Sequence, residues 1–311
     1  MLETICGAIF PVVLSMMLGY LAASLGMFNR DQATALNRMV LKFALPLDLF
    51  VGISKIDRQQ ILNSGSLAAI IIGWMIVSFF LTYWFSRFVF KRSVSLATLQ
   101  ALAVGNPSVP FVCSAVLGFL FGVKSALAVS LASMTINVLL IPIVFFLLAS
   151  DNPETMDSGG GWEGHLKQAF KQPVVLAPLI AFLFVLLGIP IPKLIGTSFV
   201  MLGRSTGGVA MFSAGILLFL MKPVINKMVV TSVTFRNILA PFCAYGLALA
   251  AHLTPFYLRE VVLTFSMPSA SVIVILSSQI KKGEREAAST VFLSTLVAIF
   301  SMGAWIAFTS E

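Results

Sequence analysis

Charged residues are scarce in this sequence. Only 10% of its 311 residues are Asp, Glu, Lys or Arg, whereas hydrophobic residues make up 59%. Soluble domains carry about 25% charged residues, so the composition excludes a soluble globular protein. A membrane-spanning helix needs about 20 apolar residues, so the chain has room for about ten such helices and for no separate soluble domain.

Cysteine and histidine are also rare, which excludes several kinds of site. Cys6, Cys113 and Cys243 lie far apart in apolar segments without a CxxC spacing, so neither a disulfide framework nor a zinc site is indicated. Neither of the two histidines belongs to an HExxH motif, and the glycine run at 159–161 lacks the Lys-Ser/Thr of a phosphate loop. We therefore expect no enzyme, no resident cofactor or metal ion, and no ATP hydrolysis.

Ten long apolar runs predict an all-α membrane protein. The predicted spans are 5–26, 33–53, 67–90, 96–121, 126–149, 174–189, 203–221, 231–253, 261–280 and 287–309. The polar segment at 150–172 divides them five and five. We expect it to be a cytoplasmic linker between a first repeat, 1–149, and a second repeat, 173–311.

Lys and Arg residues in the loops indicate the orientation, because they mark the cytoplasmic side. Twelve lie on the side opposite the N-terminus: Arg30, Arg87, Lys91, Arg92, Lys167, Lys171, Lys222, Lys227, Arg236, Lys281, Lys282 and Arg285. Five lie on the N-terminal side: Lys55, Arg58, Lys124, Lys193 and Arg259. Both termini are therefore predicted to lie outside a bacterial inner membrane. The net charge of +8 reflects this topology and not a nucleic-acid partner.

The two halves of the sequence resemble each other. PVVL at 11–14 recurs at 173–176, an offset of 162, and the Pro-Ser pair at 107–108 recurs at 268–269, an offset of 161. Because each half holds an odd number of spans, the two repeats must be inverted. Inverted repeats are typical of secondary transporters, whose substrate binds at the repeat interface.

Two spans contain proline at their centre. The fourth reads GNPSVP at 105–110 and the ninth reads SMPSAS at 266–271. Proline interrupts helical hydrogen bonding, and paired breaks in a membrane protein point to a transport site, although ordinary proline kinks are the alternative. We predict that the two breaks cross near mid-membrane and present helix N-termini to an anion. The candidate binding residues here are Asn106, Pro107, Ser108, Pro268, Ser269 and Ser271.

Three further polar residues lie within spans. Lys42, near the middle of the second span, is a candidate cation for a substrate carboxylate, since an intramembrane charge is functional by default; the alternative is a structural pair with Asp48. Asp48 is a candidate for proton or sodium coupling, or a helix-end carboxylate. Asn137 is predicted either to contact the crossing or to bridge two helices.

Several motifs are similar to those of the auxin efflux carrier family. They are KFALPLDLF at 42–50, GGVAMFSAGIL at 207–217, MPSA at 267–270 and AASTVFLSTL at 287–296. The resemblance implies ten helices, a scaffold of spans one, two, six and seven, a moving transport domain of spans three to five and eight to ten, and a homodimer. Bacterial members include malonate and malate permeases, and plant members export an indole carboxylate. In the family an asparagine usually stands some seven residues before a proline of the fourth span, whereas Asn106 here directly precedes Pro107, which leaves the register of the binding groups open.

The expected function is secondary transport of a small organic anion by elevator-type alternating access. A short dicarboxylate such as malonate or malate is the expected substrate, with coupling to H⁺ or Na⁺. A bulkier monocarboxylate, auxin-like or bile-acid-like, is the alternative, and a non-transporting membrane receptor or scaffold is a further one.

Overall fold

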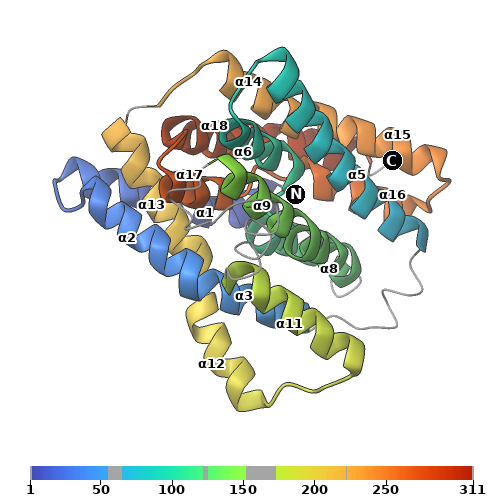
Figure 1. The fold of residues 1–311 in the computed structure, drawn as a ribbon. Coiled ribbons are helices and arrows are strands. Elements are labelled where there is room, and N and C mark those ends of the chain that lie inside the picture. Colours follow the sequence, from blue (N-terminus) through green and yellow to red (C-terminus); the bar gives the residue numbers. More distant parts are fainter. Residues whose placement is uncertain (1, 55–64, 122–124, 152–172, 222, 310–311) are drawn as a thin grey trace.

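The computed structural model is a bundle of helices (Figure 1). It describes residues 2–54, 65–121, 125–151, 173–221 and 223–309. Within these ranges no strand element occurs, and only one isolated antiparallel bridge is present, between Pro107 and Ser269. The all-helical fold expected from the sequence is confirmed. Most of the predicted linker lies outside the described residues.

The first half of the chain contains helices that are often continuous through a π-helical segment, labelled η. They are α1 (Leu2–Ser24), α2 (Arg30–Met39), η1 (Val40–Ala44), α3 (Leu45–Ser54), α5 (Gly65–Trp84), η2 (Phe85–Val89), α6 (Val94–Gly105), η3 (Val109–Cys113), α7 (Ser114–Phe121), α8 (Ala126–Met134), η5 (Thr135–Leu140) and α9 (Ile141–Asp151). Segments of π-helix are frequent at functional sites.

The second half also consists of helices in its described residues. They are α11 (Pro173–Leu187), α12 (Lys193–Gly203), α13 (Ser205–Met221), α14 (Lys227–Thr234), η6 (Phe235–Leu239), α15 (Ala240–Ala250), α16 (Pro255–Ser266), α17 (Val272–Ile280) and α18 (Glu284–Phe308).

Within the described residues, five continuous helices are long and apolar enough to cross a bilayer. They are Gly65–Val89, Leu127–Asp151, Lys193–Leu220, Lys227–Ala250 and Glu284–Phe308. Several boundaries differ from the sequence prediction, most of all that of the seventh span, which was predicted from residue 203 and begins at Lys193. Only Arg204, which keeps helical backbone angles, separates α12 from α13, so the helix continues through this cation.

Helices α1 and α13 approach each other very closely. A Cβ atom added at Gly19 would lie 1.9 Å from the carbonyl oxygen of Phe212, and one added at Gly215 would lie 1.9 Å from that of Met16. The two backbones therefore touch directly, a geometry that small residues permit between membrane helices.

Packing divides the helices into two groups. In the first, α1 and α2 pack on α13, and α3 packs on α11 and α12. In the second, α5 packs on α6, α15 on α16, α14 on α18, and α6 on α9. Fewer contacts join the groups, mainly where α13 and α1 meet α18 and where α2 meets α17.

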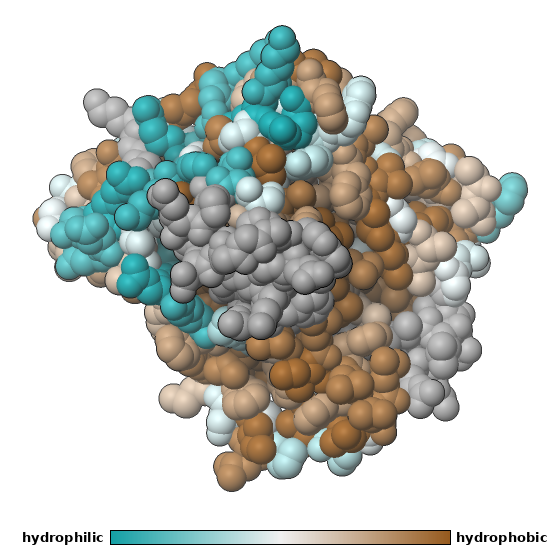
Figure 2. All heavy atoms as spheres, viewed as in Figure 1, coloured by the Kyte–Doolittle hydropathy of each residue, from teal (hydrophilic) through white to brown (hydrophobic). Residues whose placement is uncertain are grey.

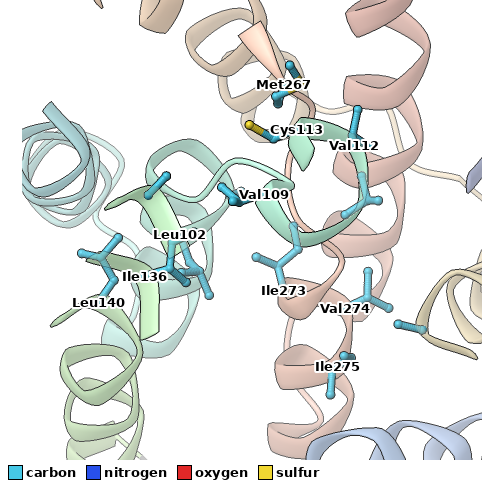
Figure 3. Close-up of a cluster of buried hydrophobic side chains, with 14 of the residues drawn as sticks. Leu102, Val109, Val112, Cys113, Ile136, Leu140, Met267, Ile273, Val274 and Ile275 are labelled. Atoms are coloured by element: carbon cyan, nitrogen blue, oxygen red, sulfur yellow. The ribbon is translucent and has the colours of Figure 1, made fainter. Parts of the chain in front are cut away.

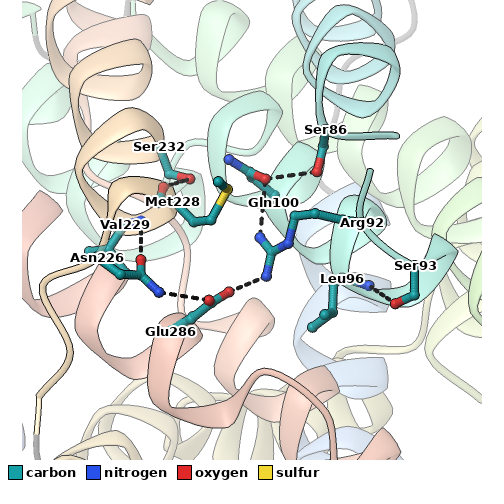
Figure 4. A network of polar contacts seen from close by, with 10 residues as sticks. All are labelled: Ser86, Arg92, Ser93, Leu96, Gln100, Asn226, Met228, Val229, Ser232 and Glu286. Atoms are coloured by element: carbon teal, nitrogen blue, oxygen red, sulfur yellow. Dashed lines mark hydrogen bonds and ion pairs between the residues drawn. The ribbon is translucent and has the colours of Figure 1, made fainter. Parts of the chain in front are cut away.

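Polar contacts gather at one end of the molecule. Arg30 pairs with Glu284 at 2.5 Å, and Arg92 pairs with Glu286, which also accepts a hydrogen bond from Asn226 (Figure 4). Figure 2 shows hydrophilic residues along the upper left edge, over α14 and the start of α2, and hydrophobic residues over much of the lower part. The starts of α2, α14 and α18 thus meet at one end, as the loop charges predict, and its assignment to the cytoplasm stays a prediction.

The α1–α13 contact can be tested with two alanine substitutions in one helix. Gly215→Ala should lower the thermal unfolding temperature of the purified protein, because the new methyl group overlaps the Met16 carbonyl. Gly208→Ala, whose added Cβ meets nothing within 4 Å, should leave that temperature unchanged or raise it, since alanine favours helix. Equal unfolding temperatures for the two variants would contradict the contact.

Candidate functional site

The chain leaves helical geometry at two places within the bundle. α6 ends before residues 106–108, and Asn106 has an extended backbone. α16 ends before residues 267–271, and Met267 is extended as well. A proline follows directly in each segment, and the residue before a proline is driven toward extended geometry. The two motifs singled out in the sequence therefore coincide with the ends of helices.

The two extended segments are hydrogen-bonded to each other. The Ser108 N–H donates to the Pro268 carbonyl at 2.9 Å, and the Ala270 N–H donates to the Asn106 carbonyl at 3.2 Å. These bonds form the isolated bridge of Pro107 and Ser269. Backbone groups that the breaks remove from helices are thus satisfied across the crossing, as the interior of a membrane protein requires.

A wholly buried arginine hydrogen-bonds the backbone carbonyls next to the crossing. Arg236, in η6, donates from Nε to the carbonyl of Met267 at 2.9 Å and from one terminal nitrogen to Val104 at 2.7 Å. Its other terminal nitrogen bonds the carbonyls of Phe265 at 3.2 Å and Thr264 at 3.4 Å. One guanidinium group therefore ties together the ends of both α6 and α16.

The positive charge of Arg236 lies where two helices have their partially negative ends. The C-terminus of a helix carries about half a negative charge, and α6 and α16 both end here. A guanidinium group supplies one positive charge and a planar set of donors, a combination that lysine lacks. The sequence assignment of Arg236 to a loop was wrong. Without it, eleven of the predicted cytoplasmic cations remain against five, so the predicted orientation is unchanged.

A second series of hydrogen bonds fixes the extended segment 267–271. The Ser269 hydroxyl donates to the Ala103 carbonyl at 2.8 Å, and the Ser269 N–H donates to the Ser294 hydroxyl oxygen at 2.9 Å. Ser294 in turn donates to the side-chain oxygen of Asn237 at 2.7 Å. The Ser269 hydroxyl, a predicted substrate group, is therefore occupied by the protein in this structure.

Apolar side chains pack around these polar contacts. In Figure 3, Val109, Cys113 and Met267 lie close to the crossing, and Ile273 and Val274 extend from it along α17. All five are almost fully buried. Hydrogen bonds in such surroundings are costly to break, because an unpaired buried polar group cannot turn to water.

A small cavity lies beside the crossing. It has a volume of about 40 Å³, which is room for about three water molecules. Its polar lining comes from Asn106, Ser133, Asn137, Thr206 and Ser271. Among the described residues, the Asn106 side-chain oxygen and the Thr206 hydroxyl are buried without a hydrogen-bond partner. Unpaired buried groups of this kind are what a polar ligand would satisfy.

The structure therefore brings some of the predicted site residues together and separates others. Asn106, Asn137 and Ser271 share the cavity. Lys42, in η1, is exposed and lines a neighbouring pocket. Asp48, in α3, lies against Gly203, where an added Cβ would be 3.0 Å from the Asp48 backbone, and it lines neither space. The binding and coupling roles of all these residues stay predictions.

Glu260 was missed in the sequence. This residue of α16 is wholly buried, and both of its carboxylate oxygens lack a hydrogen-bond partner in the described part of the chain. The predicted ninth span begins at residue 261, so Glu260 counted as a loop residue, whereas α16 begins at Pro255. An acidic residue shortly before a helix break was the available signal.

Known proteins similar to this chain are membrane transporters. The family described as "Membrane transport protein" matches residues 4–160 and 162–306. The "Uncharacterized transporter YfdV" of Escherichia coli (strain K12) is 31% identical over 310 residues, covering 98% of both chains. An "Uncharacterized transporter" of Methanothermobacter thermautotrophicus is 24% identical and covers 96% of both. The "Putative malonate transporter" of Rhizobium meliloti (strain 1021) is 22% identical, over 95% of this chain and 92% of its own.

The role of Arg236 predicts a sharp difference between two arginine variants. Arg236→Lys should lower stability by about 2 kcal/mol, since one ammonium group leaves buried carbonyls unpaired, and should lower the unfolding temperature in detergent. Arg204→Lys is the matched control, because Arg204 is exposed and should tolerate the change. An Arg236→Lys protein that unfolds at the wild-type temperature would contradict the assignment.

Proposed function

The chain belongs to the membrane transport protein family, the auxin efflux carrier-like family that its motifs resemble, and we propose that it is a secondary transporter of small organic anions. The observation that carries this proposal is the polar cavity beside the crossing. Two of its buried polar groups, from Asn106 and Thr206, have no partner in the described part of the chain. A helix begins directly at its wall.

Helix polarity at the crossing favours an anion. α17 begins at Val272, and both Ser271 and Val272 line the cavity. The first N–H groups of a helix have no acceptor within the helix, and its N-terminus carries partial positive charge. The opposing negative ends, those of α6 and α16, are matched by Arg236. Neutral donors bind a carboxylate reversibly, as a transporter requires.

A short dicarboxylate is the substrate class that we favour. One relative is named "Putative malonate transporter". That name supports malonate or malate over a bulkier auxin-like or bile-acid-like monocarboxylate. A non-transporting receptor has no need for two interrupted helices that meet in the bundle.

The position of the cavity supports alternating access. Leu45 and Leu49 of α3 and Thr206 of α13 form one wall, and residues of η5 and α17 form the other. The first wall belongs to the helix group that contains the α1–α13 contact, and the second belongs to the other group. We propose that the first group is the scaffold, with a homodimer interface as the family resemblance implies, and that the second moves as an elevator. At about 40 Å³ the cavity is too small for a dicarboxylate, so the walls must separate to admit one.

We propose Glu260, and not Asp48, as the coupling carboxylate. An isolated charge is costly to bury, so an unpartnered carboxylate inside a membrane protein is by default a place where a cation is taken up. Its titratable neighbours are the Cys113 thiol on η3 and Arg259, which precedes it and lies over the Phe121 ring. A single carboxylate can take up a proton without further ligands, so we propose a proton as the coupled cation.

The substrate site is tested by uptake of radiolabelled malonate into proteoliposomes. Asn106→Ala and Ser271→Ala should each weaken malonate binding about two- to tenfold, the effect of one lost hydrogen bond. Ser269→Ala should instead lower the unfolding temperature, because its hydroxyl bonds the Ala103 carbonyl. Ser78→Ala is the control, since its hydroxyl bonds only within its own helix. Unchanged malonate affinity in both cavity variants, or preferred transport of amines or sugars, would contradict the site.

Proton coupling is tested by measuring two activities separately: malonate exchange between equal pools, and malonate accumulation driven by a pH gradient. Glu260→Gln should retain malonate exchange between equal pools but lose accumulation driven by an imposed pH gradient, because the amide cannot take up a proton. Glu260→Asp should keep some accumulation, and Asp48→Asn should behave as wild type. If Glu260→Gln still accumulates malonate along a pH gradient, or if only a sodium gradient drives accumulation by the wild type, proton coupling at Glu260 is wrong.

A further inference from the structure

A second pocket, next to the crossing cavity, is lined by three cations. Arg38 of α2, Lys42 of η1 and Lys281 at the end of α17 surround it, and its volume is about 170 Å³. None of the described residues that line it is acidic. We call this space the cationic pocket. A concave site lined by one sign of charge concentrates ions of the opposite sign.

Two residues that line this pocket have buried side-chain amide atoms without a hydrogen-bond partner among the described residues. Asn37 is only 3% exposed, and neither its side-chain nitrogen nor its side-chain oxygen has a hydrogen-bond partner within the described ranges. Gln279, across the pocket on α17, has a buried side-chain oxygen that no group in the described part of the chain hydrogen-bonds. Leaving such groups unsatisfied is costly, so their arrangement beside three cations indicates a place for a polar, negatively charged ligand.

The pocket and the crossing cavity are neighbours along the same helix interface. Ile275, which is 2% exposed, lines both spaces. On the facing side Leu41 lines the pocket and Leu45 lines the cavity, one helical turn apart. A layer of apolar side chains therefore separates a roomy charged space from a narrow neutral one.

From this arrangement we propose that the cationic pocket is a first binding site, where an organic anion is held before it passes Ile275 and enters the crossing cavity. The inference rests on the proposed function and adds a selectivity step to it. The positive charges of the cationic pocket attract carboxylates, while the crossing cavity binds them with neutral hydrogen-bond donors. Full charges placed outside the crossing cavity do not oppose release of the substrate there.

The test compares charge removal inside and outside the pocket. Lys42→Gln and Arg38→Gln should each raise the KM for malonate about three- to tenfold, with the maximal rate kept, and should weaken the dependence of KM on KCl concentration. Lys227→Gln is the matched control. Lys227 lies 5.6 Å from the centre of the Phe90 ring and does not line the pocket, so the same loss of charge should change neither quantity. Wild-type KM and wild-type salt dependence in both pocket variants would overturn the proposal.

Anionic lipid is the other source of the same chemistry, because basic pockets between membrane helices bind lipid phosphates. Vesicles of phosphatidylcholine alone should preserve the effect of Lys42→Gln, whereas an effect that requires phosphatidylglycerol would overturn the proposal in favour of a lipid site. If the wild type carries no malonate, the proposed function fails. The cationic pocket is then tested separately, by measuring the binding of malonate or inorganic phosphate to the purified protein. Malonate or inorganic phosphate should then bind the wild type and Lys227→Gln but bind Lys42→Gln less tightly, and equal binding would refute the pocket.

Discussion

The structure depends on satisfying the backbone where two helices are interrupted inside the bundle. Every N–H and C=O group released by a break in the membrane needs a partner from the protein. The crossing provides these partners in three ways: hydrogen bonds between the extended segments, the Ser269 and Ser294 side chains, and the Arg236 guanidinium. The contribution of Arg236 is the largest, because it bonds carbonyls at the ends of both α6 and α16.

This arrangement sets the electrostatics of the proposed site. Arg236 matches the negative ends of the two helices that stop at the crossing, so the positive N-terminus of α17 remains available at the cavity wall. The chain thereby favours an anion without placing a full charge in the cavity. Full charges lie in the cationic pocket, one helical turn away along the same interface. On this view the cationic pocket attracts the substrate and the crossing cavity positions it.

The sequence predicted the helical class and the family, and its two central proline motifs lie where α6 and α16 end. These features depend on local signals, which are long apolar runs and prolines at the centre of a span. Proline alone does not end a helix, since Pro11 lies inside α1. The sequence did not predict the positions of charged side chains. Arg236 was read as a loop cation and Glu260 as a loop residue, because both lie near the ends of spans, where a few residues separate lipid depth from water. Likewise, Lys42 is close to the crossing in sequence order, but its location in a separate pocket depends on the packing of α2 and η1 against α17. The predicted inverted repeat and the individual binding roles stay predictions.

The most direct test of the central claim is a structure of the purified protein determined with malonate at saturating concentration. The account predicts ligand density in a widened crossing cavity, with one carboxylate at the first turn of α17 and contacts to Asn106 and Ser271. Arg236 should still bond the ends of α6 and α16. Malonate bound in contact with neither interrupted helix, or a crossing cavity that stays empty at saturation, would contradict the account.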